Sequence, residues 1–130
     1  IAKTGKDIML SSGMSSFAEL DDTINFLKPF GNKLSVLQCT TKYPTSAEDI
    51  GLNVLSELKE RYELPVGLSD HSSTIYPSLA ATSLGAEILE FHVVFDNIIC
   101  LTHILYIEIY LISKVLFHQQ NKILLYNPCP

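Results

Sequence analysis

Short apolar segments of strand length alternate with helix-length segments along most of this 130-residue chain. The strand-like segments occupy residues 7–11, 34–39, 64–68 and 87–92, and one helix-length segment separates each pair. Consecutive strands that are joined by a helix run parallel, because the helix returns the chain to the end at which the strand began. The sequence therefore predicts an α/β fold around a parallel sheet.

Three helix starts can be read from local signals. A glutamate follows Ser16 three residues later, which is a capping box and predicts a helix running toward Phe30. Ser46 is expected to cap the second helix, and Pro77 to open a third that ends at Gly85. Apolar residues recur every four positions in the second helix, at Ile50, Val54, Leu58 and Tyr62. That spacing indicates a helix lying on a sheet.

Two architectures contain such repeated units, a (β/α)₈ TIM barrel and a doubly wound open sheet. No strand is followed by a GxGxxG or GxxxxGKS loop, which is the usual nucleotide-binding signal of the open sheet. We therefore favour consecutive βα units of a TIM barrel, with residues 1–96 as a partial barrel domain. Four units make about half a barrel, whose two unpaired edges favour self-association unless something covers them.

The composition changes after residue 96. Residues 97–130 contain no Gly, Ala or Arg and are crowded with Ile, Leu and Tyr. His103, Glu108 and Lys114 interrupt the apolar run, so a membrane span is not favoured. A buried helix or pair of strands is one alternative. The other is a tail foreign to the domain, which would arise from splicing, a shifted frame or a gene-model error.

The charge of the chain bears on its binding partners, and its cysteine content bears on its cellular location. The formal net charge is −5 and the basic residues form no run, which argues against nucleic acid as a partner. The three cysteines, Cys39, Cys100 and Cys129, show no CxxC spacing and suggest a reducing, cytoplasmic location. The chain starts without Met, and residues 1–5 read as the end of a helix, so we expect a further portion before it.

Polar residues follow or end each predicted strand at its carboxyl end. They are Ser11, then Thr41 and Tyr43, then Ser69, then Glu90. In a barrel these ends share one rim, and active sites are built there. Turn and capping chemistry would explain any one of these residues taken singly. Their agreement across four loops predicts a site on that rim.

Two histidines, His71 and His92, stand just beyond the third and fourth predicted strands, near Asp70 and Glu90. Neighbouring parallel strands lie about 4.8 Å apart, so two imidazoles leaving the same ends could reach one ion. Each histidine alone would more simply be a hydrogen-bonded core residue. The pair predicts a site for a first-row metal ion.

Four runs occur in a fixed order with fixed spacing, namely IMLSSGM, LQCTTKYPTSAEDIGL, PVGLSDHS and GAEILEFHVVFD. Together they cover nearly all of residues 1–96 and resemble the central part of the sialic acid synthase (N-acetylneuraminate synthase) family. The resemblance implies a TIM barrel followed by a small antifreeze-like domain, in a homodimer. It also implies condensation of phosphoenolpyruvate with N-acetylmannosamine or a related N-acetylated aldose, with release of phosphate.

Site roles follow from the same resemblance. His71 and His92 match the family's metal ligands, with Mn²⁺ as the expected ion and Mg²⁺ or Co²⁺ as substitutes. Ser11 and Ser69 match hydroxyls that bind phosphoenolpyruvate. Tyr43 matches a residue at the substrate.

Two further matches complete the set. Thr41 occupies a substrate-binding position that is often Asn. Glu90, like Tyr43 a candidate catalytic residue, matches an acidic residue expected to orient or balance the site.

Departures from the family pattern bear on function. Gln38 stands where many members have His, Ser73 replaces Gly and Phe91 replaces Lys, which favours a nonulosonic acid synthase branch. The GPD-like segment expected soon after residue 96 is absent. Two alternatives therefore stand beside the synthase. One is a catalytically silent truncated product whose tail mediates protein or membrane association, and the other is a different metal-dependent barrel aldolase or lyase.

Overall fold

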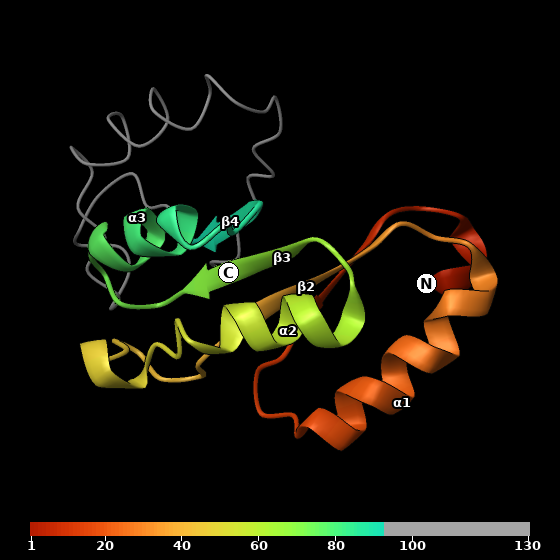
Figure 1. Cartoon of the computed structure of the whole chain (residues 1–130), viewed down its shortest axis with the longest axis horizontal. Helices are drawn as coiled ribbons and strands as arrows, with labels where there is room; N and C mark the ends of the chain where they lie inside the picture. Colours follow the sequence, from red (N-terminus) through yellow and green to blue (C-terminus); the bar gives the residue numbers. More distant parts are fainter. Residues whose placement is uncertain (93–130) are drawn as a thin grey trace, which may run out of the picture.

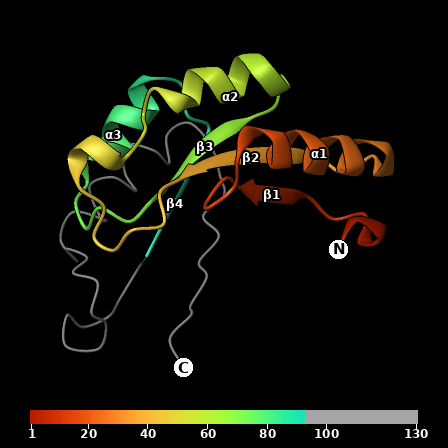
Figure 2. The ribbon, with the colours of Figure 1, turned by 90° about the horizontal axis from the view of Figure 1, so that it is seen from below.

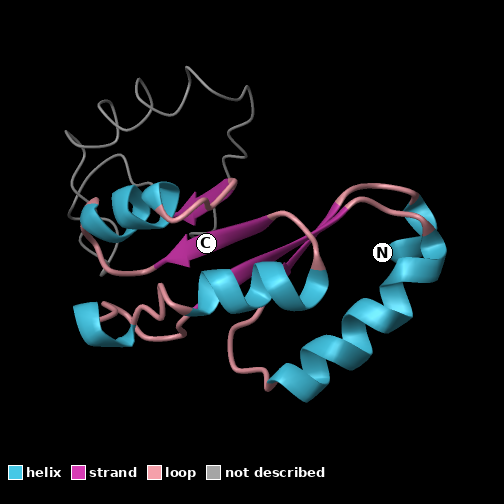
Figure 3. Ribbon diagram, viewed as in Figure 1, coloured by secondary structure: helices cyan, strands magenta, loops and turns pink. Residues whose placement is uncertain are grey.

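A computed structural model of the chain describes residues 1–92, so the predicted tail and the last positions of the predicted barrel domain lie outside it. Strands and helices alternate, as predicted. In chain order they are β1 (Ile8–Ser11), α1 (Phe17–Leu27), β2 (Leu34–Cys39), α2 (Val54–Tyr62), β3 (Val66–Asp70), α3 (Tyr76–Ser83) and β4 (Ile88–Phe91). Figure 3 shows this alternation.

The four strands form one parallel sheet in the order β1-β2-β3-β4 (Figure 1). All three helices lie on the same face of it, as Figure 2 shows from below. In a doubly wound sheet the strand order reverses and helices cover both faces. A sequential order with helices on one side is instead the arrangement of consecutive units of a (β/α)₈ barrel, so the predicted half-barrel is confirmed.

The core lies between the sheet and the helices, in two clusters of buried residues. The first consists of Leu20, Ile24, Val36, Leu58, Tyr62 and Val66, and the second of Ile50, Leu55, Leu68 and Ala81. Side chains alternate between the two faces of a strand, so the residues between these core positions point to the helix-free face. Ser69 and Glu90 are two of them, and the register pairs them directly.

The start of α1 is the predicted capping box. The Ser16 hydroxyl accepts from the backbone N–H of Glu19 at 3.3 Å, and the Glu19 carboxylate accepts from the backbone N–H of Ser16 at 2.8 Å. The hydrogen bonds that the Glu19 carboxylate accepts from the backbone N–H and the hydroxyl of Ser16 lower the pKa of Glu19. The helix passes into a 3-10 turn at Lys28–Phe30, so it reaches Phe30 as predicted, with a tighter last turn.

The predicted start of the second helix at Ser46 is wrong. Residues Ala47–Asp49 form only a 3-10 turn, and α2 begins at Val54. Between them Gly51 adopts φ 72°, which ends the helical path. The side-chain amide of Gln38, on β2, donates to the Ile50 carbonyl at 3.2 Å. The helix therefore starts only after Gly51, next to a residue that a distant strand holds in place.

The predicted third helix is present. Pro77 lies in its first turn, where its missing N–H has no helical partner to lose, and Gly85 follows its end at φ 88°. No helix within residues 1–92 is both long and apolar enough to cross a bilayer.

Candidate metal and substrate site

His71 and His92 lie side by side. Each directly follows its strand, and the register pairs Asp70 with Phe91, so the next residue of each strand faces the other. Their ring centroids are 5.2 Å apart, close to the spacing of neighbouring strands. The structure thus brings both predicted ligands together at the carboxyl end of the sheet, and their role as ligands stays a prediction.

Tyr43 completes a cluster of three rings. It lies on the loop after β2, and its ring centroid is 4.1 Å from that of His71 and 5.7 Å from that of His92. Its hydroxyl is 3.0 Å from His71 Nε2. The side chain is 49% exposed, so one side of the cluster faces solvent.

The other ring nitrogen of His71 decides the tautomer. Nδ1 lies 3.0 Å from the Thr40 carbonyl oxygen, which can only accept. Nδ1 therefore carries the proton, and in the neutral ring Nε2 keeps a lone pair. The Tyr43 hydroxyl then donates to Nε2. An imidazole whose N–H is held in this way and whose second nitrogen is unprotonated suits metal binding.

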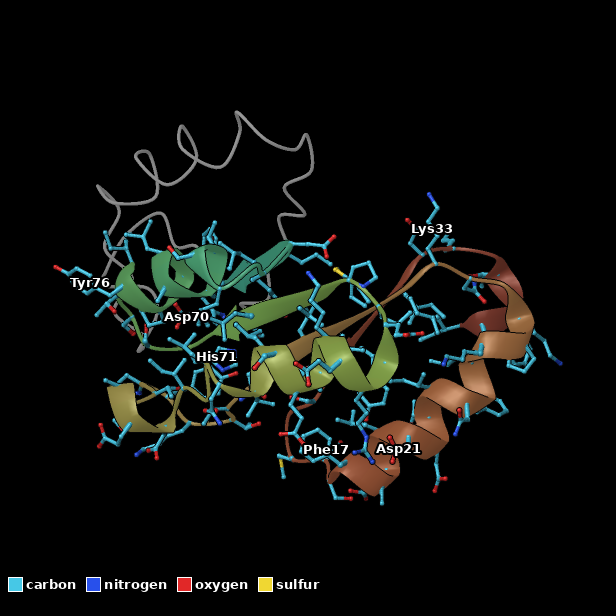
Figure 4. The ribbon with its side chains drawn as sticks, in the orientation of Figure 1. Phe17, Asp21, Lys33, Asp70, His71 and Tyr76 are labelled. Atoms are coloured by element: carbon cyan, nitrogen blue, oxygen red, sulfur yellow. The ribbon has the colours of Figure 1, made fainter. Side chains whose placement is uncertain are left out.

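Hydrogen bonds on both sides of His71 fix its backbone. The backbone N–H of Thr45 donates to the His71 carbonyl at 2.9 Å, and the Thr45 hydroxyl donates to the Lys42 carbonyl at 2.6 Å. On the other side Asp70 accepts from the Ser72 backbone N–H and from the Ser78 hydroxyl. Figure 4 shows Asp70 and His71 together at the end of β3.

Sequence reasoning missed Thr45 and Ser78. Both are buried, yet in sequence each resembles an ordinary loop or helix-start hydroxyl residue. Nothing in the local pattern distinguishes them, because the contact of the Thr45 backbone N–H with His71 and that of the Ser78 hydroxyl with Asp70 form only in the folded chain.

Two groups of the cluster have shifted pKa values. Burial lowers the pKa of His92, the neighbouring His71 lowers it further, and Glu90 opposes both. Burial raises the pKa of Tyr43, with smaller contributions from Cys39 and Glu90. Both shifts favour the neutral forms, so at neutral pH His92 offers a lone pair and Tyr43 retains its proton.

The remaining predicted residues lie along the carboxyl ends of the strands, on the helix-free face. Ser69 is buried and lies between Cys39 and Glu90 in the register, while Glu90 is exposed. Ser11 is exposed at the end of β1. Hydroxyl and carboxylate groups thus line the carboxyl end of the sheet from β1 to β4.

Thr41 belongs to the same rim. A Cβ at Gly13 would lie 2.9 Å from the Thr41 hydroxyl oxygen, so the loops after β1 and β2 are close together there. The glycine permits this approach, because a side chain would push the loops apart.

The imidazoles of His71 and His92 provide some, but not all, of the ligands that a metal ion needs. Within residues 1–92 no group of three or more His, Cys, Asp or Glu side chains is placed to hold one. His71 and His92 would supply two imidazole nitrogens, ligands that suit first-row ions, and leave the other positions to water or substrate oxygens. Such an open coordination sphere is that of a catalytic rather than a structural site.

Comparisons with known proteins agree with this arrangement. The model of the NeuB family matches residues 1–101. An N,N'-diacetyllegionaminic acid synthase of Campylobacter jejuni is 40% identical over 100 residues, which are 75% of this chain and 30% of that protein. The human N-acetylneuraminate-9-phosphate synthase is 38% identical over 97 residues, 74% of this chain and 27% of that enzyme.

A solved structure also matches. The N-acetylneuraminic acid synthetase of Leptospira borgpetersenii superposes with a TM-score of 0.75 at 28% identity, covering 95% of this chain and 47% of that one. The chain spans less than a third of the length of the curated relatives above.

Proposed function

The chain belongs to the NeuB family, and on that premise we propose that it carries the metal-binding part of a nonulosonic acid synthase site. The observation that carries the proposal is the pair of imidazoles, His71 and His92, facing each other in register at the catalytic end of a barrel sheet. Relatives matched at similar identity are named as legionaminic, pseudaminic and N-acetylneuraminate-9-phosphate synthases. Their shared chemistry, rather than any one substrate, is the basis of the proposal.

The proposed reaction joins phosphoenolpyruvate to an N-acetylated aldose, N-acetylmannosamine or a close relative. The enol carbon attacks the aldehyde carbon, water adds at the carbon that bears the phosphate, and phosphate leaves. A bound Mn²⁺, or Mg²⁺ or Co²⁺ in its place, would supply Lewis acidity at the aldehyde oxygen. His71 and His92 would hold that ion.

The other rim residues bind and orient the substrates. Hydroxyl donors such as those of Ser11 and Ser69 suit the phosphate and carboxylate of phosphoenolpyruvate, because they donate hydrogen bonds without needing positive charge. We assign Thr41 and the half-exposed Tyr43 to the binding of the aldose. Glu90, which pairs with Ser69 in the register, places a negative charge beside the histidines and favours a bound cation.

The setting of the enzyme follows from the same family. We propose a cytoplasmic protein that acts as a homodimer, as the resemblance to the family implies. Nothing in the proposal involves nucleic acid.

Phosphate release tests the proposal. The protein is incubated with phosphoenolpyruvate and N-acetylmannosamine, with and without Mn²⁺, and a second N-acetylated aldose is tried in parallel. The expected result is phosphate release that needs both the aldose and the metal ion. Turnover only with an aldehyde that lacks the N-acetyl group would favour another barrel aldolase. No turnover with any aldose would favour a catalytically silent product.

A further inference from the structure

The Tyr43 hydroxyl lies at the one atom of His71 that a metal ion would need. It is 3.0 Å from Nε2, and the Thr40 carbonyl holds the proton of Nδ1 on the other side of the ring. A neutral imidazole has a single lone pair in the plane of its ring. Nε2 therefore accepts from Tyr43 or coordinates a cation, but does not do both.

We propose that the Tyr43 hydroxyl competes with the metal ion for His71 Nε2, so that binding of the ion releases this hydroxyl toward the substrate. The inference rests on the proposed function, because it takes His71 as a ligand. It adds a coupling between two neighbouring residues of the site. Binding of the ion to His71 and release of the Tyr43 hydroxyl therefore occur together.

The geometry leaves the ring little alternative. A half-turn of the His71 ring would exchange both nitrogens for carbons, and the hydrogen bonds to Thr40 and Tyr43 would be lost together. The backbone is held as well, since Thr45 donates to the His71 carbonyl. Tyr43 is the less constrained partner, because it lies on a loop and is 49% exposed. The hydroxyl rather than the imidazole is the group that moves.

One substitution at this site is expected to strengthen metal binding rather than weaken it. Tyr43→Phe keeps the ring that packs 4.1 Å from His71 but removes the competing hydroxyl. The affinity for Mn²⁺ is expected to rise by about two- to ten-fold, which is the effect of one ordinary hydrogen bond. A tyrosine that ligates the ion would give the opposite change, and one that touches only substrate would give none.

Calorimetric titration with Mn²⁺ alone tests the proposal on the intact chain. The variants are Tyr43→Phe, His71→Ala and the matched control Tyr76→Phe. The control also removes a tyrosine hydroxyl, from an exposed position on α3. Tighter binding in Tyr43→Phe and unchanged binding in Tyr76→Phe support the proposal. Equal or weaker binding in Tyr43→Phe overturns it, and if His71→Ala still loses binding the proposed metal site stands. Unchanged binding in His71→Ala overturns both.

Nitrogen NMR of ¹⁵N-labelled histidine gives an independent measurement. In the metal-free protein His71 is expected to carry its proton on Nδ1, and Tyr43→Phe should shift the Nε2 resonance without changing the tautomer. A proton on Nε2 would overturn the proposal, because Tyr43 would then accept from the ring and leave no lone pair to compete for. An Nε2 resonance that is the same in Tyr43→Phe would overturn it as well.

Discussion

The buried carboxylate of Asp70 accepts a hydrogen bond from the hydroxyl of Ser78 at 3.1 Å, which ties the end of β3 to α3. Its second oxygen accepts from the backbone N–H of Ser72 at 2.8 Å. His71 lies between Asp70 and Ser72, so one carboxylate fixes the backbone on both sides of the proposed ligand. Asp70 thereby positions the backbone that carries His71.

Replacing Asp70 by Ala should weaken both the fold and the site. The change removes the acceptor of two buried donors, which costs about 1–3 kcal/mol of unfolding free energy, and frees the turn that presents His71. Mn²⁺ affinity should fall as well. Asp70→Asn keeps one oxygen acceptor, so its stability and its Mn²⁺ affinity should lie between those of the parent and of Asp70→Ala. Chemical denaturation and Mn²⁺ titration measure the effects. Asp22→Ala, on the exposed side of α1, is the control; Asp70→Ala with both properties unchanged would contradict the assigned role.

Each histidine should be needed for the ion. His71→Ala and His92→Ala each remove one of two nitrogen donors, so each is expected to reduce Mn²⁺ binding below detection. Mn²⁺ electron paramagnetic resonance measures the bound fraction directly. Lys33→Ala, at the opposite end of the sheet in Figure 4, is the control. Full binding in either histidine variant would remove that residue from the site.

Gly67 should not tolerate a side chain. It lies on β3 between Leu37 and Ile88, and an added Cβ would lie 2.5 Å from Leu37 Cδ2 and 2.8 Å from Ile88 Cβ. Gly67→Ala is therefore expected to lower the unfolding free energy by about 1–3 kcal/mol. It should also weaken Mn²⁺ binding, because it pushes β4 and His92 away from β3.

Gly5→Ala is the matched control for Gly67. It adds the same methyl group where no heavy atom lies within 4 Å, so only its left-handed backbone, φ 70°, carries a cost, of about 1 kcal/mol. Mn²⁺ affinity should be unchanged there. If the two variants bind Mn²⁺ alike, the close packing of β3 and β4 does not set the distance between the histidines.

The capping box should make stability sensitive to acid. The folded-state pKa of Glu19 is lowered below its ordinary value of 4.5, so its contribution is fully present above that value and is lost as the pH falls through the folded pKa. Glu19→Gln should be less stable than the parent at neutral pH, and the deficit should shrink as the pH falls from neutral through the folded-state pKa of Glu19. Thermal unfolding across this range measures it. Glu60→Gln, at an exposed position of α2, is the control. A stability deficit of Glu19→Gln that is independent of pH would contradict the prediction.

Local signals in the sequence were sufficient for most of the fold. Ser16 and Glu19 determine where α1 begins through contacts three residues apart, and Pro77 and Gly85 bound α3 in the same way. The alternation of strand and helix implied a parallel sheet, and the polar strand ends indicated the rim that carries the site. These features depend on neighbours in the chain, which is why they can be read from it.

Tertiary structure decided the rest. The second helix starts at Val54 rather than at Ser46, after Gly51 turns to φ 72° and where Gln38 reaches Ile50 from another strand. Tyr43 and Thr40 meet the ring of His71 across 28 and 31 residues of sequence.

The sequence therefore determined which residues stand at the ends of the strands, because backbone periodicity and capping act over a few residues. Only the folded chain decided which of those side chains touch. The pairing of Asp70 with Phe91 places His92 beside His71. That register depends on packing between segments that no local pattern encodes.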